Sequence, residues 1–179
     1  IGKQGSGTFN QSGGTNTISD ALTIQTYDGS SGTYDLSGGT LSAPAIENHG
    51  TFIQSGGIVS SGTTLNNRGT FSFSGGTFHG HLHLHDQGYL SMASGSTLTA
   101  GGGITNDDTW SIYSGRTVNA NGPGLVNNNY ISLQGELGGS GPLLNNGRML
   151  ASGTISGSSG FTNNAFFEQS GDLTISNSG

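Results

Sequence analysis

Four histidines follow one another at alternate positions in one short stretch of the chain, residues 77–86. Imidazole is the most common metal ligand among protein side chains, so four rings at this spacing suggest metal-binding chemistry. On a β-strand, residues two apart point to the same face, so all four rings would share one face and the two intervening leucines the other. Adjacent rings would stand ~6.8 Å apart, close enough for two of them to bind one ion. The residues are His79, His81, His83 and His85, with Leu82 and Leu84 between them.

A metal centre needs a third ligand, which in a stack of strands has to come from a neighbouring strand. The side chains expected beside the histidines carry hydroxyl or methyl groups, which are weak ligands or none. They are Ser60, Ser61, Thr63 and Thr64 on one side, and Thr97, Thr99 and Ala100 on the other. The sequence therefore predicts an outward polar strand face with no metal and no cofactor, and the four histidines are candidates only.

Carboxylates are the second group that could do chemistry. Enzymes that cleave polysaccharides need acids that converge on one bond, as general acid and base or as nucleophile. The ten Asp and Glu residues are dispersed along the chain, and their one cluster is Asp107-Asp108, expected near Asp86 and within reach of His85. Acids in such positions are also ordinary turn residues. No catalytic residue is predicted, and the chain is not expected to be an enzyme.

Charge and composition exclude several classes of partner. The net charge is −6 and only four residues are Lys or Arg, which argues against nucleic acid and against an anionic membrane surface. No apolar run approaches the ~20 residues that a membrane-spanning helix requires. Although only 30% of residues are hydrophobic and 35 are glycine, the aromatic residues are spread evenly along the chain, unlike those of a Gly/Ser linker. The composition therefore indicates a folded protein built with few large side chains.

The even spacing of the aromatic residues comes from a sequence repeat. The sequence Gly-Thr-Phe-Asn-Gln-Ser-Gly-Gly-Thr at 7–15 recurs in related form at 32–40, 50–57 and 69–77, and more loosely to the end of the chain. Its aromatic position, which we call the anchor, returns at intervals of 18 to 25 residues. Repeats of this length are too short for helical-repeat arrays, and Gly, Asn, Ser and Thr are poor helix formers. The nine anchors are Phe9, Tyr34, Phe52, Phe71, Leu90, Trp110, Ile131, Met149 and Phe167.

An asparagine precedes most anchors by four residues, with an apolar residue two positions earlier. Stacked side-chain amides can hydrogen-bond to one another from strand to strand, so the asparagines are predicted to form a ladder at one corner of each coil. Asn also tolerates the left-handed backbone that a corner can require, and the Gly-Gly pair suits a second corner for the same reason. The predicted ladder is Asn48, Asn67, Asp86, Asn106, Asn127, Asn145, Asn163 and Asn177.

These patterns together predict an all-β, right-handed β-solenoid of about nine coils, with the anchors stacked inside a narrow core. Residues 1–179 are predicted to be one solenoid domain, with regular repeats in 1–90 and degenerate repeats in 91–179. At the ~4.8 Å spacing of hydrogen-bonded strands, nine coils make a rod ~43 Å long.

The repeats at 7–15 and 65–71, the latter Leu-Asn-Asn-Arg-Gly-Thr-Phe, resemble those of bacterial autotransporter-type passengers and related large secreted surface proteins. The resemblance is close over 1–90 and weak beyond. It implies an exported β-helix, extracellular or on a bacterial cell surface. Repeats of this type are a feature of architecture and carry no activity of their own.

Both termini fall within a repeat, which leads to the functional expectation: a structural surface protein that assembles head to tail with copies of itself into a filament. The alternatives are an internal segment of a long surface adhesin, for which surface glycans are candidate partners, and a carbohydrate-active solenoid. Neither nucleic acid binding nor membrane insertion is expected.

Overall fold

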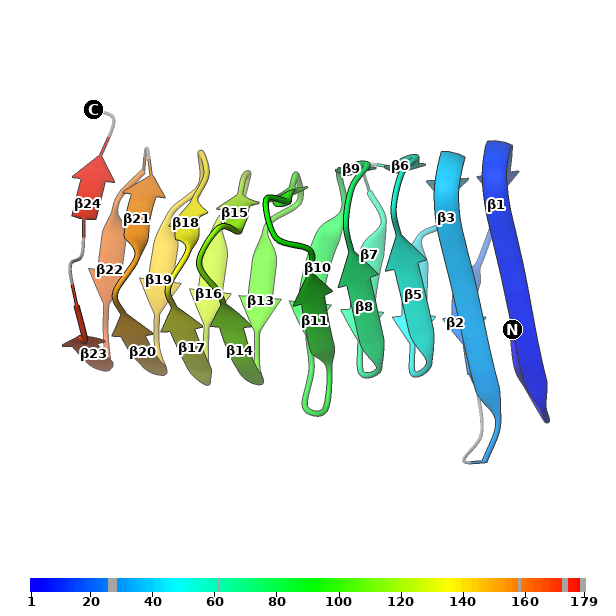
Figure 1. Ribbon diagram of the computed structural model, residues 1–179, viewed down its shortest axis with the longest axis horizontal. Helices are drawn as coiled ribbons and strands as arrows, with labels where there is room; N and C mark the ends of the chain where they lie inside the picture. The colour runs from blue at the N-terminus through cyan, green and yellow to red at the C-terminus, as the bar shows by residue number, and fades with distance from the viewer. Residues whose placement is uncertain (26–28, 61, 158, 172–173, 178–179) are drawn as a thin grey trace.

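The computed structural model describes residues 1–25, 29–60, 62–157, 159–171 and 174–177. Within these ranges the chain forms strands and turns with no helix, and therefore no helix that could cross a membrane. All strand pairs are parallel and join successive coils of one stack (Figure 1). In Figure 1 the chain rises along the near strands, crosses the top and descends behind them as it advances from β1 to β24, which is a right-handed winding. The predicted all-β solenoid is confirmed.

Each coil crosses three faces, which we name in chain order the anchor face, the second face and the ladder face. The anchor face holds β1 (Ser6–Thr17), β3 (Ser31–Ser42), β5 (Thr51–Gln54), β8 (Thr70–Phe73), β11 (Tyr89–Met92), β14 (Thr109–Ile112), β17 (Tyr130–Leu133), β20 (Arg148–Ala151) and β23 (Phe166–Gln169). The second face holds β6 (Ile58–Val59), β9 (Thr77–Phe78), β12 (Thr97–Ala100), β15 (Thr117–Ala120), β18 (Glu136–Gly138), β21 (Thr154–Gly157) and β24 (Thr174–Asn177). The ladder face holds β2 (Ala21–Ile24), β4 (Ala45–Asn48), β7 (Thr64–Asn67), β10 (His81–Leu84), β13 (Ile104–Asn106), β16 (Leu125–Asn127), β19 (Leu143–Asn145) and β22 (Phe161–Asn163).

The ladder face is one sheet of eight strands, so the described chain makes seven complete turns between β2 and β22. Partial coils at either end carry the first and last anchors, which accounts for the small difference from the nine coils predicted. β1 and β3 are long because they bend from the anchor face onto the second face, and β3 pairs with both β5 and β6.

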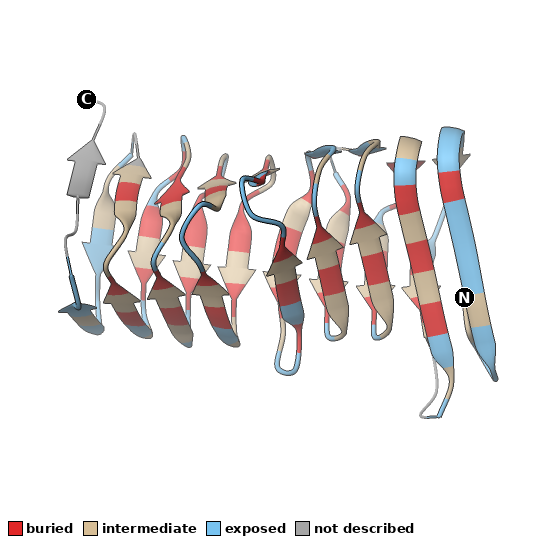
Figure 2. Ribbon diagram, viewed as in Figure 1, coloured by how far each residue is buried: buried red, intermediate tan, exposed pale blue. Residues whose placement is uncertain are grey.

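Alternation along each short strand separates the core from the surface. In most strands the first and third residues are partly or fully exposed and the second and fourth are buried, as the alternating bands of Figure 2 show. Seven of the nine anchors are buried as predicted, from Tyr34 through Met149. The two on the end coils differ: Phe9 is 44% exposed and Phe167 is only half-buried, because each is covered by a neighbouring coil on one side only. Aromatic rings stack in the first coils, with centroids 5.1 Å apart for Phe9–Tyr34 and 5.3 Å for Phe52–Phe71.

The asparagine ladder is present but comes in two runs. Asn48 Nδ2 donates to Asn67 Oδ1 at 2.6 Å, and a longer run joins Asn106, Asn127, Asn145 and Asn163 at 2.6 to 2.8 Å. Each is the last residue of a ladder-face strand, and all but Asn163 are fully buried. None has a left-handed backbone; among the described non-glycine residues only Gln25 and Gln87 do. Asparagine is therefore needed here for its side-chain amide and not for its backbone conformation. At the other corner, Gly39, Gly57 and Gly76 have the predicted positive φ.

Two predicted members of the ladder are wrong. Leu84, not Asp86, lies between Asn67 and Asn106 in the sheet, because four residues join β10 to β11 where two join β7 to β8. Asp86 is exposed in that longer turn, and Leu82 takes the apolar position predicted for Leu84. Asn177 lies on the second face, where its backbone pairs with Gly157.

Leu84 breaks the ladder because a leucine side chain neither donates nor accepts a hydrogen bond. Asn106 Oδ1 is consequently buried without a hydrogen-bond partner among the described residues, and so is Asn48 Oδ1, which follows Ile24 in the stack. Asn67 Nδ2, at the end of the first run, keeps only the bond to the next anchor strand that the other ladder asparagines also make, here to the carbonyl oxygen of Tyr89.

The same coil contains a discontinuity that we call the seam. Among the described strands, β11 pairs with β8 but not with β14, and β9 does not pair with β12, whereas β10 pairs with both β7 and β13. The ladder face alone therefore carries continuous pairing from the first coils to the last. The histidine strand β10 belongs to the last coil before the seam.

Candidate functional site

The histidine strand β10 turns its leucines inward and its histidines outward, as predicted. Leu82 and Leu84 are buried, while His81 and His83 are half-buried on the outer surface and His85 follows directly in the turn. His79 is exposed in the turn that precedes the strand, separated from it by Gly80. Three of the four histidines thus form one row on the ladder face.

The neighbours of this row differ from those expected. On the preceding coil β10 pairs with Thr64 and Asn66, so one expected residue is correct; Ser61 lies outside the described residues. On the following coil it pairs with Thr105, and Asp107 comes next, whereas Thr97, Thr99 and Ala100 belong to β12 on the second face. The hydroxyl and methyl side chains predicted beside the histidines on the following coil are therefore wrong, and Asp107 stands there with Thr105.

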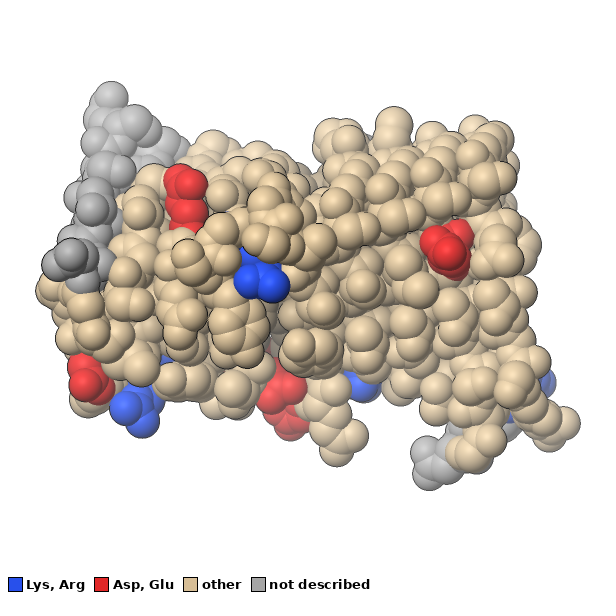
Figure 3. Space-filling view, in the orientation of Figure 1, with Lys and Arg blue, Asp and Glu red and all other residues tan. Residues whose placement is uncertain are grey.

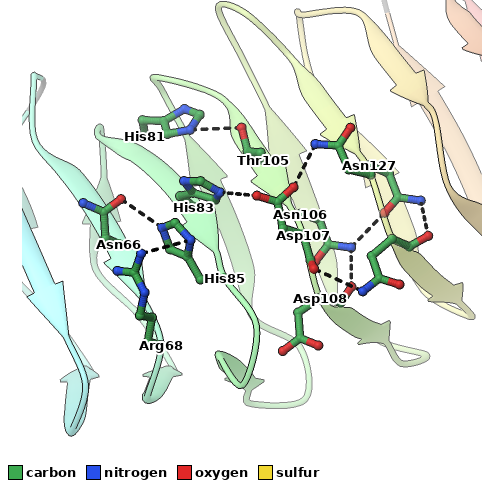
Figure 4. Close-up of polar contacts among 12 residues, drawn as sticks. Asn66, Arg68, His81, His83, His85, Thr105, Asn106, Asp107, Asp108 and Asn127 are labelled. Atoms are coloured by element: carbon green, nitrogen blue, oxygen red, sulfur yellow. Dashed lines mark hydrogen bonds and ion pairs between the residues drawn. The ribbon is translucent and has the colours of Figure 1, made fainter.

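Asp107 brings a carboxylate to the histidines (Figure 4). His83 Nε2 lies 2.6 Å from Asp107 Oδ2, and the rings of His83 and His85 are tilted by 32° with centroids 3.6 Å apart. One ligand atom from each of the three side chains lies within 4.8 Å of the other two. The side chains of His83 and Asp107 are 24% and 36% exposed, so the cluster is open to solvent on its outer side.

His81 is occupied elsewhere. Its Nδ1 lies 2.8 Å from the carbonyl oxygen of Gly102 and its Nε2 lies 3.2 Å from Thr105 Oγ1. A carbonyl only accepts, so Nδ1 carries the proton and Nε2 accepts from the hydroxyl. Both contacts reach across to the following coil, and His81 therefore ties the two coils together beside the cluster.

The electrostatics of the cluster favour an ionised Asp107 and a neutral His85. Burial by itself raises the pKa of the Asp107 carboxyl, but hydrogen bonds from His83 and Asn128 and the nearby imidazoles outweigh it, so the pKa lies below its ordinary value. The pKa of His85 is lowered, first by burial and then by the charges of His83 and Arg68. Arg68 in turn lies 3.5 Å from Glu47, whose carboxylate by itself raises the pKa of His85.

A second amide ladder, which sequence reasoning missed, ends at Asp107. Asn164, Asn146 and Asn128 each donate a side-chain hydrogen bond to the preceding coil, and the last of these bonds, 2.8 Å long, reaches Asp107 Oδ1. Each of these residues directly follows an asparagine of the first ladder and points to the outer surface. The Asn-Asn doublets at 127–128, 145–146 and 163–164 were the signal in the sequence.

The other predicted acids do not add to the cluster in the described contacts. Asp108 Oδ1 accepts from the backbone N–H of Thr109 at 2.6 Å, an ordinary turn role, and Asp86 is exposed in the turn after His85. The expected proximity of Asp107 to the histidines is confirmed, with His83 as its direct partner.

The fold and this surface define the class: a parallel β-solenoid with an imidazole–carboxylate cluster on one face. No protein-family model, curated protein sequence or solved structure matches the chain.

Proposed function

We propose that the chain is a structural rod of an extracellular or bacterial cell-surface protein, and that its solenoid is continued head to tail by further copies into a filament. The observation that carries the proposal is the state of the two end coils. Phe9 is 44% exposed on the first coil and Phe167 is only half-buried on the last, whereas the anchors between them are buried. Figure 2 shows the same contrast on the anchor face, where β1 and β23 are largely exposed.

Stacking of one end coil on another would cover these side chains. The register of the anchor face places Phe9 at the position that follows Phe167, and Gln11 at the position that follows Gln169. Ring would then lie on ring, and the two amides could hydrogen-bond as the asparagines do. The outer edges of β1 and β23 would exchange backbone hydrogen bonds, since an edge strand presents a row of unpaired N–H and C=O groups.

The surface between the ends suits a passive rod. On the face drawn in Figure 3, Lys, Arg, Asp and Glu are few and scattered over uncharged atoms. The resemblance of the repeats to secreted surface passengers supports the proposed location. The alternative, an internal segment of a longer adhesin, predicts the same coil-on-coil contact within one polypeptide.

Electron microscopy and light scattering of the purified chain test the assembly. We expect fibres with an axial period between ~34 Å, for seven coils per subunit, and ~43 Å, for nine, at the ~4.8 Å strand spacing. Phe9→Glu should abolish them by placing a charge in the contact, while Tyr89→Glu, a matched change at a 57% exposed aromatic on the side of the rod, should not. A monomer at all concentrations, together with a natural polypeptide that extends well past both ends by mass spectrometry, would favour the internal segment.

A further inference from the structure

The imidazole–carboxylate cluster lies where the solenoid is least continuous. It joins β10 to the turn after β13, across the seam, while β11 and β14 are unpaired with each other on the adjacent face. The chemistry of the cluster is that of a metal site: two imidazoles and a carboxylate are ligands that divalent first-row ions accept.

We propose that His83, His85 and Asp107 bind a divalent first-row transition ion, Zn²⁺ foremost, which clamps the two coils across the seam. Three protein ligands leave a fourth tetrahedral position for water. The partial exposure of the cluster gives an ion a path of entry from solvent.

The present distances fit this occupancy with small movements. Two ligands ~2.1 Å from a tetrahedral ion stand ~3.4 Å apart. The hydrogen bond between His83 and Asp107, 2.6 Å long, would open slightly, and the third ligand atom, within 4.8 Å of the others, would close. Among the described residues, the imidazole of His85 has two long polar contacts to lose, each 3.4 Å, one to Arg68 and one to Asn66.

The surroundings already orient the carboxylate. Asn128 Nδ2 holds Asp107 Oδ1 at 2.8 Å, which leaves Oδ2 directed at the imidazole of His83. Outer partners of this kind set the orientation of metal ligands, and their loss typically costs ~10- to 100-fold in affinity. The outer amide ladder therefore serves as the support of the site.

A run of alternating histidines could bind metal even in an unfolded chain, so the decisive ligand is Asp107. It stands 24 residues from His83 and meets it only in the solenoid. Asp108 provides the matched control, since Asp108→Asn makes the same change of charge one residue away from the cluster.

The test is a titration of the untagged chain with Zn²⁺ by calorimetry, with Co²⁺ as the spectroscopic probe of tetrahedral coordination. We expect one ion per chain, a loss of at least ~10-fold in affinity for Asp107→Asn and for His83→Asn, and less than ~2-fold change for Asp108→Asn and His79→Asn. Circular dichroism verifies that each variant is folded, as expected for outward side chains.

A second readout separates a clamp from simple surface binding. Zn²⁺ should raise the thermal unfolding midpoint of the wild-type chain and not that of Asp107→Asn, because only an ion bound to the folded state stabilises it. Absence of stoichiometric binding would overturn the proposal. Equal affinity in wild type and Asp107→Asn, or binding that persists in denaturant, would overturn it in favour of the histidine run alone.

Discussion

The coils before the seam and the coils after it build the same cross-section from different side chains. Before the seam, aromatic rings fill the core: Phe71 contacts Phe52, Phe73 and Phe78 with centroids 5.3 to 6.1 Å apart. After it, the anchors that follow Trp110 are Ile131, Met149 and, on the last coil only, Phe167, and amide ladders run both inside and outside the ladder face. Backbone pairing between coils is common to both halves, so the side chains need only fill the space and satisfy their polar groups.

The largest expected effect tests the aromatic half. Phe71→Ala should lower the free energy of unfolding by about 3–5 kcal/mol, because it removes a fully buried ring that touches three others and leaves a cavity. Met149→Ala, equally buried after the seam, should cost less, about 2–3 kcal/mol, since methionine is a flexible side chain whose site tolerates substitution better than that of a ring. Denaturant unfolding measures both, and an equal or reversed order would contradict the comparison.

The amide half is tested by Asn127→Ala, which should cost about 2–3 kcal/mol. The change removes the donor to Asn145 Oδ1 and the acceptor of Asn106 Nδ2, leaving buried polar atoms with fewer partners. The matched control is Asn163→Ala at the exposed end of the ladder, where water replaces the lost bond and the cost should stay below ~1 kcal/mol. A similar loss of unfolding free energy at both positions would mean that the buried part of the ladder stabilises the fold no more than its exposed end does.

The seam itself is tested at Arg116, whose Nε donates to the carbonyl oxygen of Met92 at 2.7 Å and so spans the unpaired strands. Arg116→Met keeps most of the side-chain bulk and should cost about 1 kcal/mol. Amide hydrogen exchange should rise in β11 and β14 more than elsewhere. Arg148→Met, which removes an exposed ion pair of 3.5 Å with Glu168, serves as the control and should change little. Uniform exchange across the chain in Arg116→Met would contradict a local seam.

The smallest effect concerns pH. His85 has a lowered pKa in the folded chain, so the unfolded state binds its proton more readily and stability falls as pH drops through the ordinary value near 6.5. The loss between pH 7 and 5 should be well under ~1 kcal/mol because solvent screens the group. His85→Asn should flatten this part of the stability profile and His49→Asn, an exposed residue in another turn, should not. A profile unchanged in His85→Asn would contradict the assignment.

Much of the fold follows from local pattern. The two-residue alternation around each anchor predicts which side chains are inside, and Tyr34, Phe52 and Leu82 obey it. The Gly-Gly corners are equally readable, because a Cβ at Gly76 would stand 2.5 Å from the carbonyl oxygen of Gly56. The site was predictable only in part. The outward direction of the histidines follows from alternation, but the position of Asp107 beside His83 depends on the register between two coils.

The sequence by itself determined the period, the inward and outward faces and the asparagine ladder, since each depends on residues within one repeat and on the two-residue period of a strand. The tertiary structure alone decided that Leu84 interrupts the ladder, that β11 and β14 are unpaired, and that Asp107 meets His83. Two additional residues in the turn after β10 move the ladder position from Asp86 to Leu84 in that coil alone, and from Asn106 onward the asparagine again precedes its anchor by four residues. A spacing counted along the chain cannot tell which strand absorbs such an insertion, because hydrogen bonding and packing between coils set the register.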